Sequence, residues 1–199
     1  MGSSPGLGTG SGTVLVTGMS GAGKSTVLGE LSARGYRVVD LDDDGWTVEV
    51  PTDDGTAAGA GAGAGTAAGT GTGTEQLWRE DRVAALLASG ADAPHVVGGC
   101  ATNQGVFYDR FVAVVLLSAP VEVLRDRLAT RSTNDFGKSP QELERILRDL
   151  AEVEPLLRAT STTEIDTTAP VSQVADTVEA LLTRFLARPS HDHDRGPER

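Results

Sequence analysis

The chain has 199 residues, a formal net charge of −11 and one cysteine, Cys100. An acidic chain lacks the basic patch with which nucleic-acid binders neutralise phosphates, and anionic membrane surfaces repel it, so neither is an expected partner. A lone cysteine forms no internal disulfide, and no signal-peptide pattern or apolar run of about 20 residues is present, which favours the cytoplasm. We expect a monomer or a weak dimer.

Composition divides the chain into four kinds of segment. Residues 1–12, rich in Gly, Ser and Thr, are expected to be a disordered leader, and residues 188–199 a disordered polar tail. Residues 13–187 form one domain. Within it, residues 55–74 are almost wholly Gly, Ala and Thr. Such a tract has few side chains to pack, so we expect a flexible insertion.

Strand-like and helix-like segments alternate along this domain. The predicted strands are 13–17, 36–40, 95–97, 111–117 and 163–166. The predicted helices are 24–34, 75–89, 120–131, a helix from 139 that bends or stops at Pro155, and 170–187. This alternation predicts an α/β fold with a parallel sheet, helices on both faces and ligands at the carboxyl ends of the strands.

A phosphate-binding pattern follows the first predicted strand. It reads Gly18-Met19-Ser20-Gly21-Ala22-Gly23-Lys24-Ser25-Thr26. The glycines let the backbone N–H groups wrap round a phosphate, and the following helix adds its positive N-terminal dipole. Lys24 is expected to reach the β- and γ-phosphates of ATP and the Ser25 hydroxyl to bind Mg²⁺. The alternative is a glycine-rich turn with a chance Lys-Ser pair.

An acidic cluster follows the second predicted strand. Asp40 and Asp42 are its first members, and neither Asp nor Glu ends the third strand. One carboxylate there can orient the hydroxyl of a phosphoryl acceptor or take its proton, while another holds a water of the Mg²⁺ shell. We assign Asp42 to the acceptor and to the metal; the alternative is a solvated acidic turn.

Arginines lie beside a predicted lid loop, residues 131–140. Arg127 and Arg131 share one helix face at i, i+4 spacing. They are candidates to stabilise the transferring phosphoryl group, while closure of the loop excludes water. The alternative is an exposed, charged helix face.

Two further segments are candidates for the acceptor site. Gly98-Gly99 permits a substrate to approach the backbone, or else forms a simple tight turn. Arg79 and Arg82 can line an acceptor pocket, whereas Trp78, at helical spacing, is expected in the core.

Together these residues resemble the P-loop kinases that include shikimate, gluconate and adenylate kinases, and within that group the small proteins labelled AAA-family ATPase or shikimate-kinase-like. The resemblance runs from Thr13 to Leu186. It implies a three-layer P-loop NTPase sandwich with a five-stranded parallel sheet in the order 2-3-1-4-5. The site residues that it implies are Asp42, Arg79 or Arg82, Gly98 and Gly99 at the acceptor, Arg127 and Arg131 in the lid, and the segment with Thr168 and Pro170 against adenine.

Two departures from that group concern the acceptor. Cys100 stands where the family has a third glycine, and residues 55–74 occupy the region of the acceptor subdomain. We therefore expect an ATP- and Mg²⁺-dependent transfer of a phosphoryl group to a hydroxyl or phosphate of a small molecule other than shikimate. The alternative is an ATP-binding regulatory switch with slow hydrolysis and no small acceptor.

Overall fold

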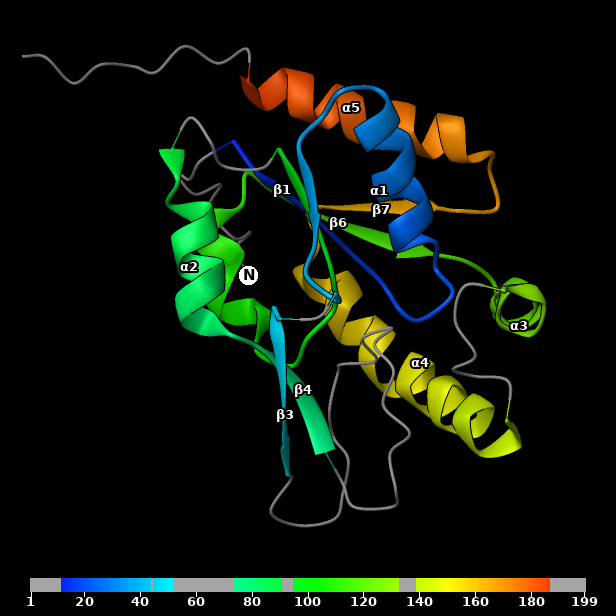
Figure 1. Ribbon diagram of the computed structural model, residues 1–199. Helices are drawn as coiled ribbons and strands as arrows, with labels where there is room; N and C mark the ends of the chain where they lie inside the picture. Colours follow the sequence, from blue (N-terminus) through cyan, green and yellow to red (C-terminus); the bar gives the residue numbers. More distant parts are fainter. Residues whose placement is uncertain (1–11, 44, 52–73, 91–94, 133–138, 187–199) are drawn as a thin grey trace, which may run out of the picture.

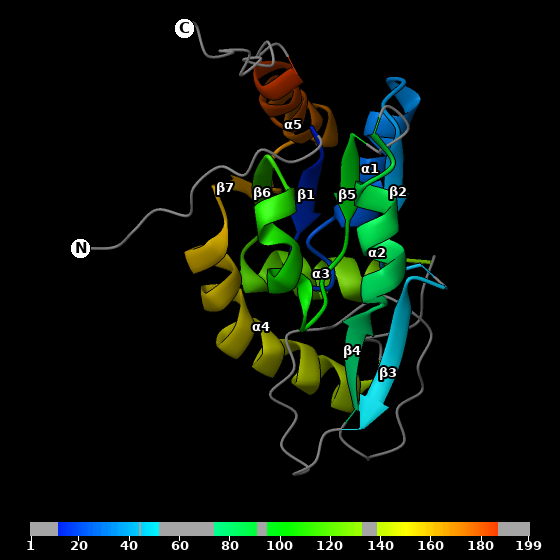
Figure 2. The same cartoon turned by 90° about the vertical axis from the view of Figure 1, so that its left-hand side faces the viewer.

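A computed structural model of the protein describes residues 12–43, 45–51, 74–90, 95–132 and 139–186. Its centre is a five-stranded parallel sheet in the order β2-β5-β1-β6-β7 (Figure 2). The strands are β1 (Val14–Thr17), β2 (Val38–Asp40), β5 (Val96–Gly98), β6 (Ala113–Ser118) and β7 (Thr163–Asp166). Counted along the chain within this sheet, the order is 2-3-1-4-5, so the predicted topology is confirmed.

Helices cover both faces of the sheet, which makes three layers (Figure 2). The alternation of side chains along β1 shows why: Val14 and Val16 join the core cluster of α1 and α5, whereas Leu15 joins that of α2 and η2. These elements are α1 (Lys24–Ala33), α5 (Val171–Leu186), α2 (Glu80–Leu87) and the 3-10 helix η2 (Gln104–Arg110). The α4 helix (Pro140–Thr160) packs Val153 and Leu157 against Leu116 of β6.

The helix predicted from residue 139 is α4, and it begins with a capping box. The amide of Glu142 donates to Ser139 Oγ at 3.2 Å, and the amide of Ser139 donates to Glu142 Oε2 at 3.3 Å. The predicted stop at Pro155 is wrong, because α4 continues through it to Thr160. A proline removes one backbone hydrogen bond, and in this helix the remaining bonds and the buried face keep the helix continuous.

The helix predicted for residues 75–89 is wrong in its first part. Thr74–Trp78 is strand β4, which pairs antiparallel with β3 (Thr47–Pro51), and α2 begins only at Glu80. The hairpin projects beyond the main sheet (Figure 1). Helical periodicity is a local signal, and here a partner strand distant in sequence satisfies the backbone instead. Trp78 ends β4 in the core, as expected, at 1% exposure.

Four segments predicted from composition lie outside the described residues, wholly or nearly so. They are the leader, the insertion, the tail and the middle of the lid loop, residues 133–138. Gly12 and Thr74, at the edges of two of these segments, are described, and Thr74 belongs to β4. Within the described ranges, no helix is long and apolar enough to cross a membrane.

Candidate nucleotide and acceptor site

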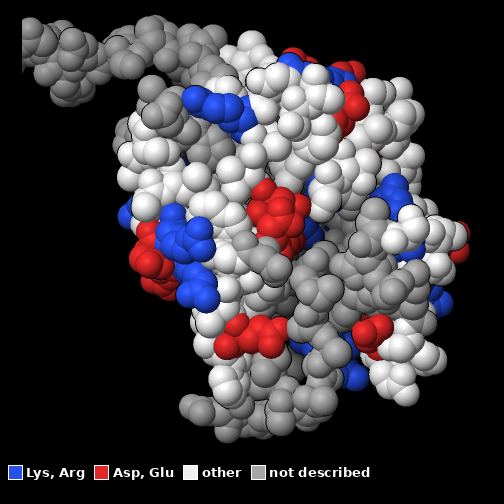
Figure 3. Space-filling view, in the orientation of Figure 1, with Lys and Arg blue, Asp and Glu red and all other residues white. Residues whose placement is uncertain are grey.

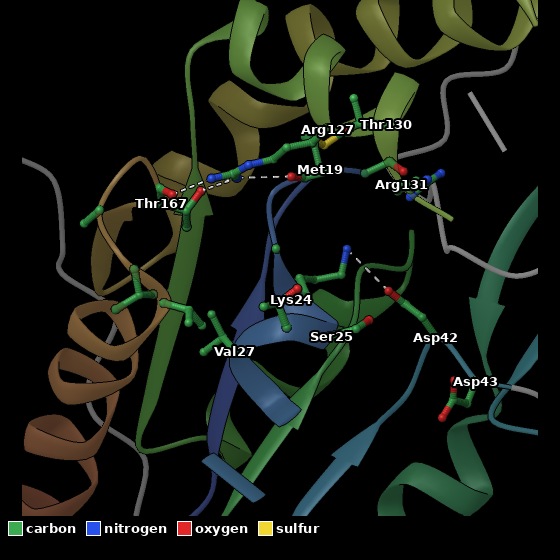
Figure 4. Close-up of a pocket in the computed structure, with 17 residues that line it drawn as sticks. Met19, Lys24, Ser25, Val27, Asp42, Asp43, Arg127, Thr130, Arg131 and Thr167 are labelled. Atoms are coloured by element: carbon green, nitrogen blue, oxygen red, sulfur yellow. Dashed lines mark hydrogen bonds and ion pairs between the residues drawn. The ribbon is translucent and has the colours of Figure 1, made fainter. Parts of the chain in front are cut away.

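A pocket of about 740 Å³ opens at the carboxyl ends of the strands (Figure 4). This volume suits a bound small molecule. Its walls come from the phosphate-binding loop and α1, from the end of β2, from α3 (Val121–Thr130) and from the segment after β7. The charged lining residues are Lys24, Asp42, Asp43, Arg127 and Arg131. The sheet therefore gathers into one pocket most of the residues singled out from the sequence.

The phosphate-binding loop links β1 to α1 in the manner expected. Gly21 and Gly23 have φ of +85° and +99°, a region that glycine enters at little cost, and Gly23 directly precedes α1. The backbone amides of the loop thus precede a helix N-terminus, which suits an anion. Ser20, Gly21, Gly23, Lys24, Ser25 and Thr26 all line the pocket, whereas Gly18 and Ala22 lie behind it.

Lys24 is buried and paired. Its ammonium donates to the Gly18 carbonyl at 2.8 Å and lies 3.4 Å from Asp42 Oδ2, and the two side chains are 6% and 5% exposed. Figure 4 shows them pointing toward one another. Burial opposes the charge of Lys24, but nearby acidic groups, Asp42 first, outweigh it and raise the pKa of the ammonium. The lysine predicted to bind phosphate is thus also part of the packed interior.

Asp42 is held on both sides. Its Oδ1 accepts the amide of Cys100 at 2.9 Å, and its Oδ2 faces Lys24 without a hydrogen bond to any residue in the described part of the chain. Burial raises the pKa of Asp42, and the attraction of Lys24 partly offsets that effect. A buried carboxylate with a raised pKa is suited to accept a proton once its ammonium partner turns to another anion.

Asp40 has a different partner. Its Oδ2 accepts the Ser25 hydroxyl at 2.9 Å, while its Oδ1 accepts the amide of Asp42 at 3.1 Å. Asp43, at the rim of the pocket, points away from Lys24 (Figure 4). The structure therefore divides the acidic cluster, with Asp40 beside the predicted metal-binding hydroxyl and Asp42 beside the lysine. Acidic side chains gather near the middle of the face seen in Figure 3, where β2 ends in Figure 1.

Arg127 joins the phosphate-binding loop to the segment after β7. Its guanidinium donates to the Thr167 hydroxyl at 2.9 Å, to the Thr167 carbonyl at 2.5 Å and to the Gly21 carbonyl at 3.3 Å. Thr167, Ala169 and Val171 line the pocket there. The predicted Thr168 and Pro170 are exposed and do not line it, so the predicted segment reaches the pocket through its alternate residues.

Arg131 is the C-cap of α3 and lines the pocket beside Thr130. Burial lowers the pKa of its guanidinium, and Glu142 at the start of α4 partly restores it. The i, i+4 pair of arginines predicted for the lid thus reaches the pocket from one helix. The two side chains serve different parts of it, since Arg127 alone contacts Thr167.

The arginines predicted for the acceptor do not line this pocket. Arg79 donates to the Thr47 carbonyl at 3.2 Å. Arg82 donates to the Gly45 carbonyl at 2.5 Å and stacks over the Trp46 ring with its guanidinium carbon 5.0 Å from the ring centroid. In the structure both side chains support the connection between the acidic cluster and β3.

Gly98 and Gly99 meet protein atoms and likewise lie outside the lining. A Cβ at Gly98 would stand 2.4 Å from Leu28 Cδ1 of α1. Gly99, at φ +151°, leaves space for Trp78 and for Asp42 Oδ1, which would be 3.0 and 3.1 Å from a Cβ. These glycines therefore let α1 and Asp42 approach the end of β5.

Two amide side chains that the sequence analysis missed lie behind the site. Gln104, 3% exposed, accepts the Thr17 hydroxyl at 3.2 Å and donates to the Tyr108 hydroxyl at 2.9 Å. Asn103 accepts the amide of Trp78 at 2.8 Å and donates to its carbonyl at 3.0 Å. They brace the end of β1 and of β4. The available signal was a pair of adjacent amides at the start of η2, a few residues after the buried strand β5.

The residues present fit a magnesium ion that is shared with a nucleotide. In the described ranges no group of three His, Cys, Asp or Glu side chains could hold a metal on its own. Mg²⁺, however, usually takes few protein oxygens together with substrate phosphates and waters. The neighbouring oxygens of Ser25 and Asp40 provide such a partial donor set.

The parallel sheet and the glycine-rich loop between β1 and α1 define an α/β P-loop protein. The profile of the AAA domain family matches residues 14–148, and the chain belongs to this family. No curated protein sequence matches the chain.

Three solved structures share the architecture at low sequence identity. A gluconokinase from Sinorhizobium meliloti 1021 is 21% identical, with 88% of this chain and 92% of that chain covered, at a TM-score of 0.50. A shikimate kinase from Acinetobacter baumannii in complex with shikimate is 18% identical over 92% and 97%, at 0.49. A sugar kinase from Janibacter sp. HTCC2649 is 18% identical over 85% and 93%, at 0.46. At these identities the likeness concerns the fold alone.

Proposed function

We propose that the protein is an ATP-dependent phosphotransferase that moves the γ-phosphoryl group to a hydroxyl or phosphate group of a small molecule. The observation that carries the proposal is the meeting of Lys24, Ser25 and Asp42 at one pocket, with Asp42 beside the lysine and Asp40 bonded to the Ser25 hydroxyl. A protein that only bound nucleotide would need no second acid buried beside the lysine.

Each residue has one task in the proposed reaction. Lys24 leaves Asp42 and holds the β- and γ-phosphates together with the loop amides. Ser25, with Asp40 behind it, would hold Mg²⁺, which neutralises charge on the phosphate oxygens. Arg127 fixes the nucleotide between the loop and Thr167. Arg131 faces the group in transfer.

Asp42 completes the chemistry at the acceptor. Its open Oδ2 accepts the proton of the acceptor hydroxyl as that oxygen forms the new P–O bond, while the bond from the γ-phosphorus to the bridging oxygen of ADP breaks. Proton transfer to a positioned carboxylate is typically worth about 10²–10⁴-fold in rate. A phosphate acceptor, already ionised, would use the pocket without this step.

A screen of acceptors tests the proposal. ATP consumption is followed with sugars, polyols, hydroxy acids and nucleotides, and products of the responding acceptor are identified by mass spectrometry. Asp42→Asn should lose transfer by about 10²–10⁴-fold and still bind ADP, as measured by calorimetry on protein shown to be folded. Slow hydrolysis with no phosphorylated product from any acceptor would favour a nucleotide switch instead.

A further inference from the structure

We propose that the hydroxyl of Ser20 donates a hydrogen bond to the phosphoryl group that is transferred, which makes Ser20 a side-chain contact added to the backbone amides of the loop. This inference rests on the proposed function. Ser20 lines the pocket and is 2% exposed. Its Oγ has no hydrogen-bond partner among the residues that the structure describes.

The buried hydroxyl of Ser20 differs from the other hydroxyls that line the same pocket. Ser25 bonds to Asp40, Thr130 to the Asp126 carbonyl at 2.7 Å and Thr167 to the Ser118 carbonyl at 3.1 Å, while Thr26 is exposed to solvent. A buried polar group without a partner is costly, and proteins rarely keep one without a use. A phosphoryl oxygen only accepts hydrogen bonds, so it is the complement of this donor.

The position of Ser20 in the loop indicates which phosphoryl group it meets. Its neighbour on one side, Gly21, accepts a hydrogen bond from Arg127, toward the segment after β7. Its neighbour on the other side, Met19, packs with Cys100, whose amide holds Asp42. Ser20 therefore stands between the nucleotide side of the pocket and the acceptor side, where the γ-phosphoryl group must lie during transfer.

A second open atom supports this arrangement. Asp42 Oδ2, like Ser20 Oγ, is buried and makes no hydrogen bond within the described part of the chain. While ionised, the carboxylate oxygen of Asp42 can only accept a proton, whereas the hydroxyl of Ser20 can donate one. An acceptor hydroxyl supplies the proton that Asp42 lacks, and the moving phosphoryl group supplies the oxygen that Ser20 lacks. The acceptor hydroxyl and the phosphoryl group, which react with each other, would thus give Asp42 Oδ2 and Ser20 Oγ their hydrogen-bond partners.

The test compares ADP with a non-hydrolysable ATP analogue. Calorimetry measures both affinities for the parent and for Ser20→Ala, with Mg²⁺ present, and thermal unfolding measures the nucleotide-free proteins. We expect Ser20→Ala to weaken the analogue by about 10-fold or more, as for a hydrogen bond to a charged group, and to leave ADP within about twofold. Nucleotide-free stability should stay equal or rise, because the variant loses a polar atom that has no partner.

A matched control removes a buried hydroxyl that has a partner. Thr17→Val leaves Gln104 Oε1 without its donor, so it should lower nucleotide-free stability and keep the parent ratio of the two affinities. Ser20→Gly, which also lacks the hydroxyl, repeats the measurement if Ser20→Ala does not fold.

The outcomes separate this inference from the proposed function. Equal losses for ADP and analogue, or an unchanged analogue affinity, in the folded Ser20 variant would overturn the role of Ser20, even where the parent phosphorylates an acceptor. A selective loss of analogue affinity supports it, even where no acceptor responds and the kinase proposal fails. A parent that binds neither nucleotide would overturn both.

Discussion

The buried pair of Lys24 and Asp42 can be tested by removing each charge in turn. Asp42→Asn keeps an oxygen for the amide of Cys100 and deletes the charge that faces Lys24 at 3.4 Å. At that separation and an effective dielectric constant of about 20, the attraction amounts to about 5 kcal/mol. Desolvation of both ions offsets much of it in the intact pair, but a lone buried ammonium keeps its own desolvation cost.

The expected loss is therefore large for a single substitution. Breaking a buried ion pair from one side typically costs about 3–5 kcal/mol of unfolding free energy, and we expect Asp42→Asn and Lys24→Met each to fall in this range. The double variant carries no uncompensated charge, so its loss should be smaller than the sum of the two by at least about 2 kcal/mol.

Urea unfolding followed by circular dichroism gives these values for all four proteins, at a temperature where each is folded. Losses that add within about 0.5 kcal/mol would refute the pairing, because independent sites behave in that way. The result bears on function as well, since a lysine that depends on Asp42 for its burial must exchange that partner for phosphate when nucleotide binds.

Three further predictions follow from contacts near the pocket. Gly98→Ala should lower the unfolding free energy by about 1–3 kcal/mol, because its Cβ would stand 2.4 Å from Leu28 Cδ1. Gly29→Ala, on the same helix as Leu28 and with open space at its Cβ, should instead be neutral or stabilising in the same urea experiment. Arg127→Lys should weaken ADP by about 10-fold in calorimetry, because a lysine cannot repeat the fork of bonds to Thr167 and Gly21, while Arg125→Lys on the exposed face of α3 should bind as the parent does. Burial raises the pKa of Cys100 to about 11 from 9.0, so the folded protein keeps a proton that the unfolded chain releases, and stability should fall as pH rises from about 9 to 11. Cys100→Ala should remove that fall, which amounts to about 2 to 3 kcal/mol, and equal pH profiles of the two proteins would contradict the shift.

The sequence was sufficient for the sheet and for the centre of the site. The β-branched run of β1 leading into a glycine-rich loop is a local pattern, and so is the alternation of strands with helices. Both therefore predicted a parallel sheet covered on both faces and the place of Lys24 and Ser25 after its first strand, whereas the strand order was implied by the resemblance to the P-loop kinases. The place of the acidic residues after β2 could also be predicted, since the carboxyl ends of parallel strands meet at the same edge of the sheet.

The missing parts depend on contacts between distant segments. The residues near Thr74–Trp78 give no indication that Thr47–Pro51 pairs with them as a strand, and the local periodicity favoured a helix. The separate partners of Asp40 and Asp42 also depend on how β2 meets α1 and the end of β5, which spacing alone does not specify. Gly98 seemed to make room for a substrate, whereas the side chain that it accommodates is Leu28.

The hairpin of β3 and β4 has a consequence for how the sequence can change. Pro51 and Thr74 are cross-strand partners, so the described chain stops and resumes at points one strand spacing apart, about 4.8 Å. Closing a longer connection between such points costs only about 0.6 kcal/mol for each doubling of its length. We therefore expect the connection between Pro51 and Thr74 to accept added or removed sequence, and a reporter module inserted there to leave the edge of the sheet that carries Lys24 in place.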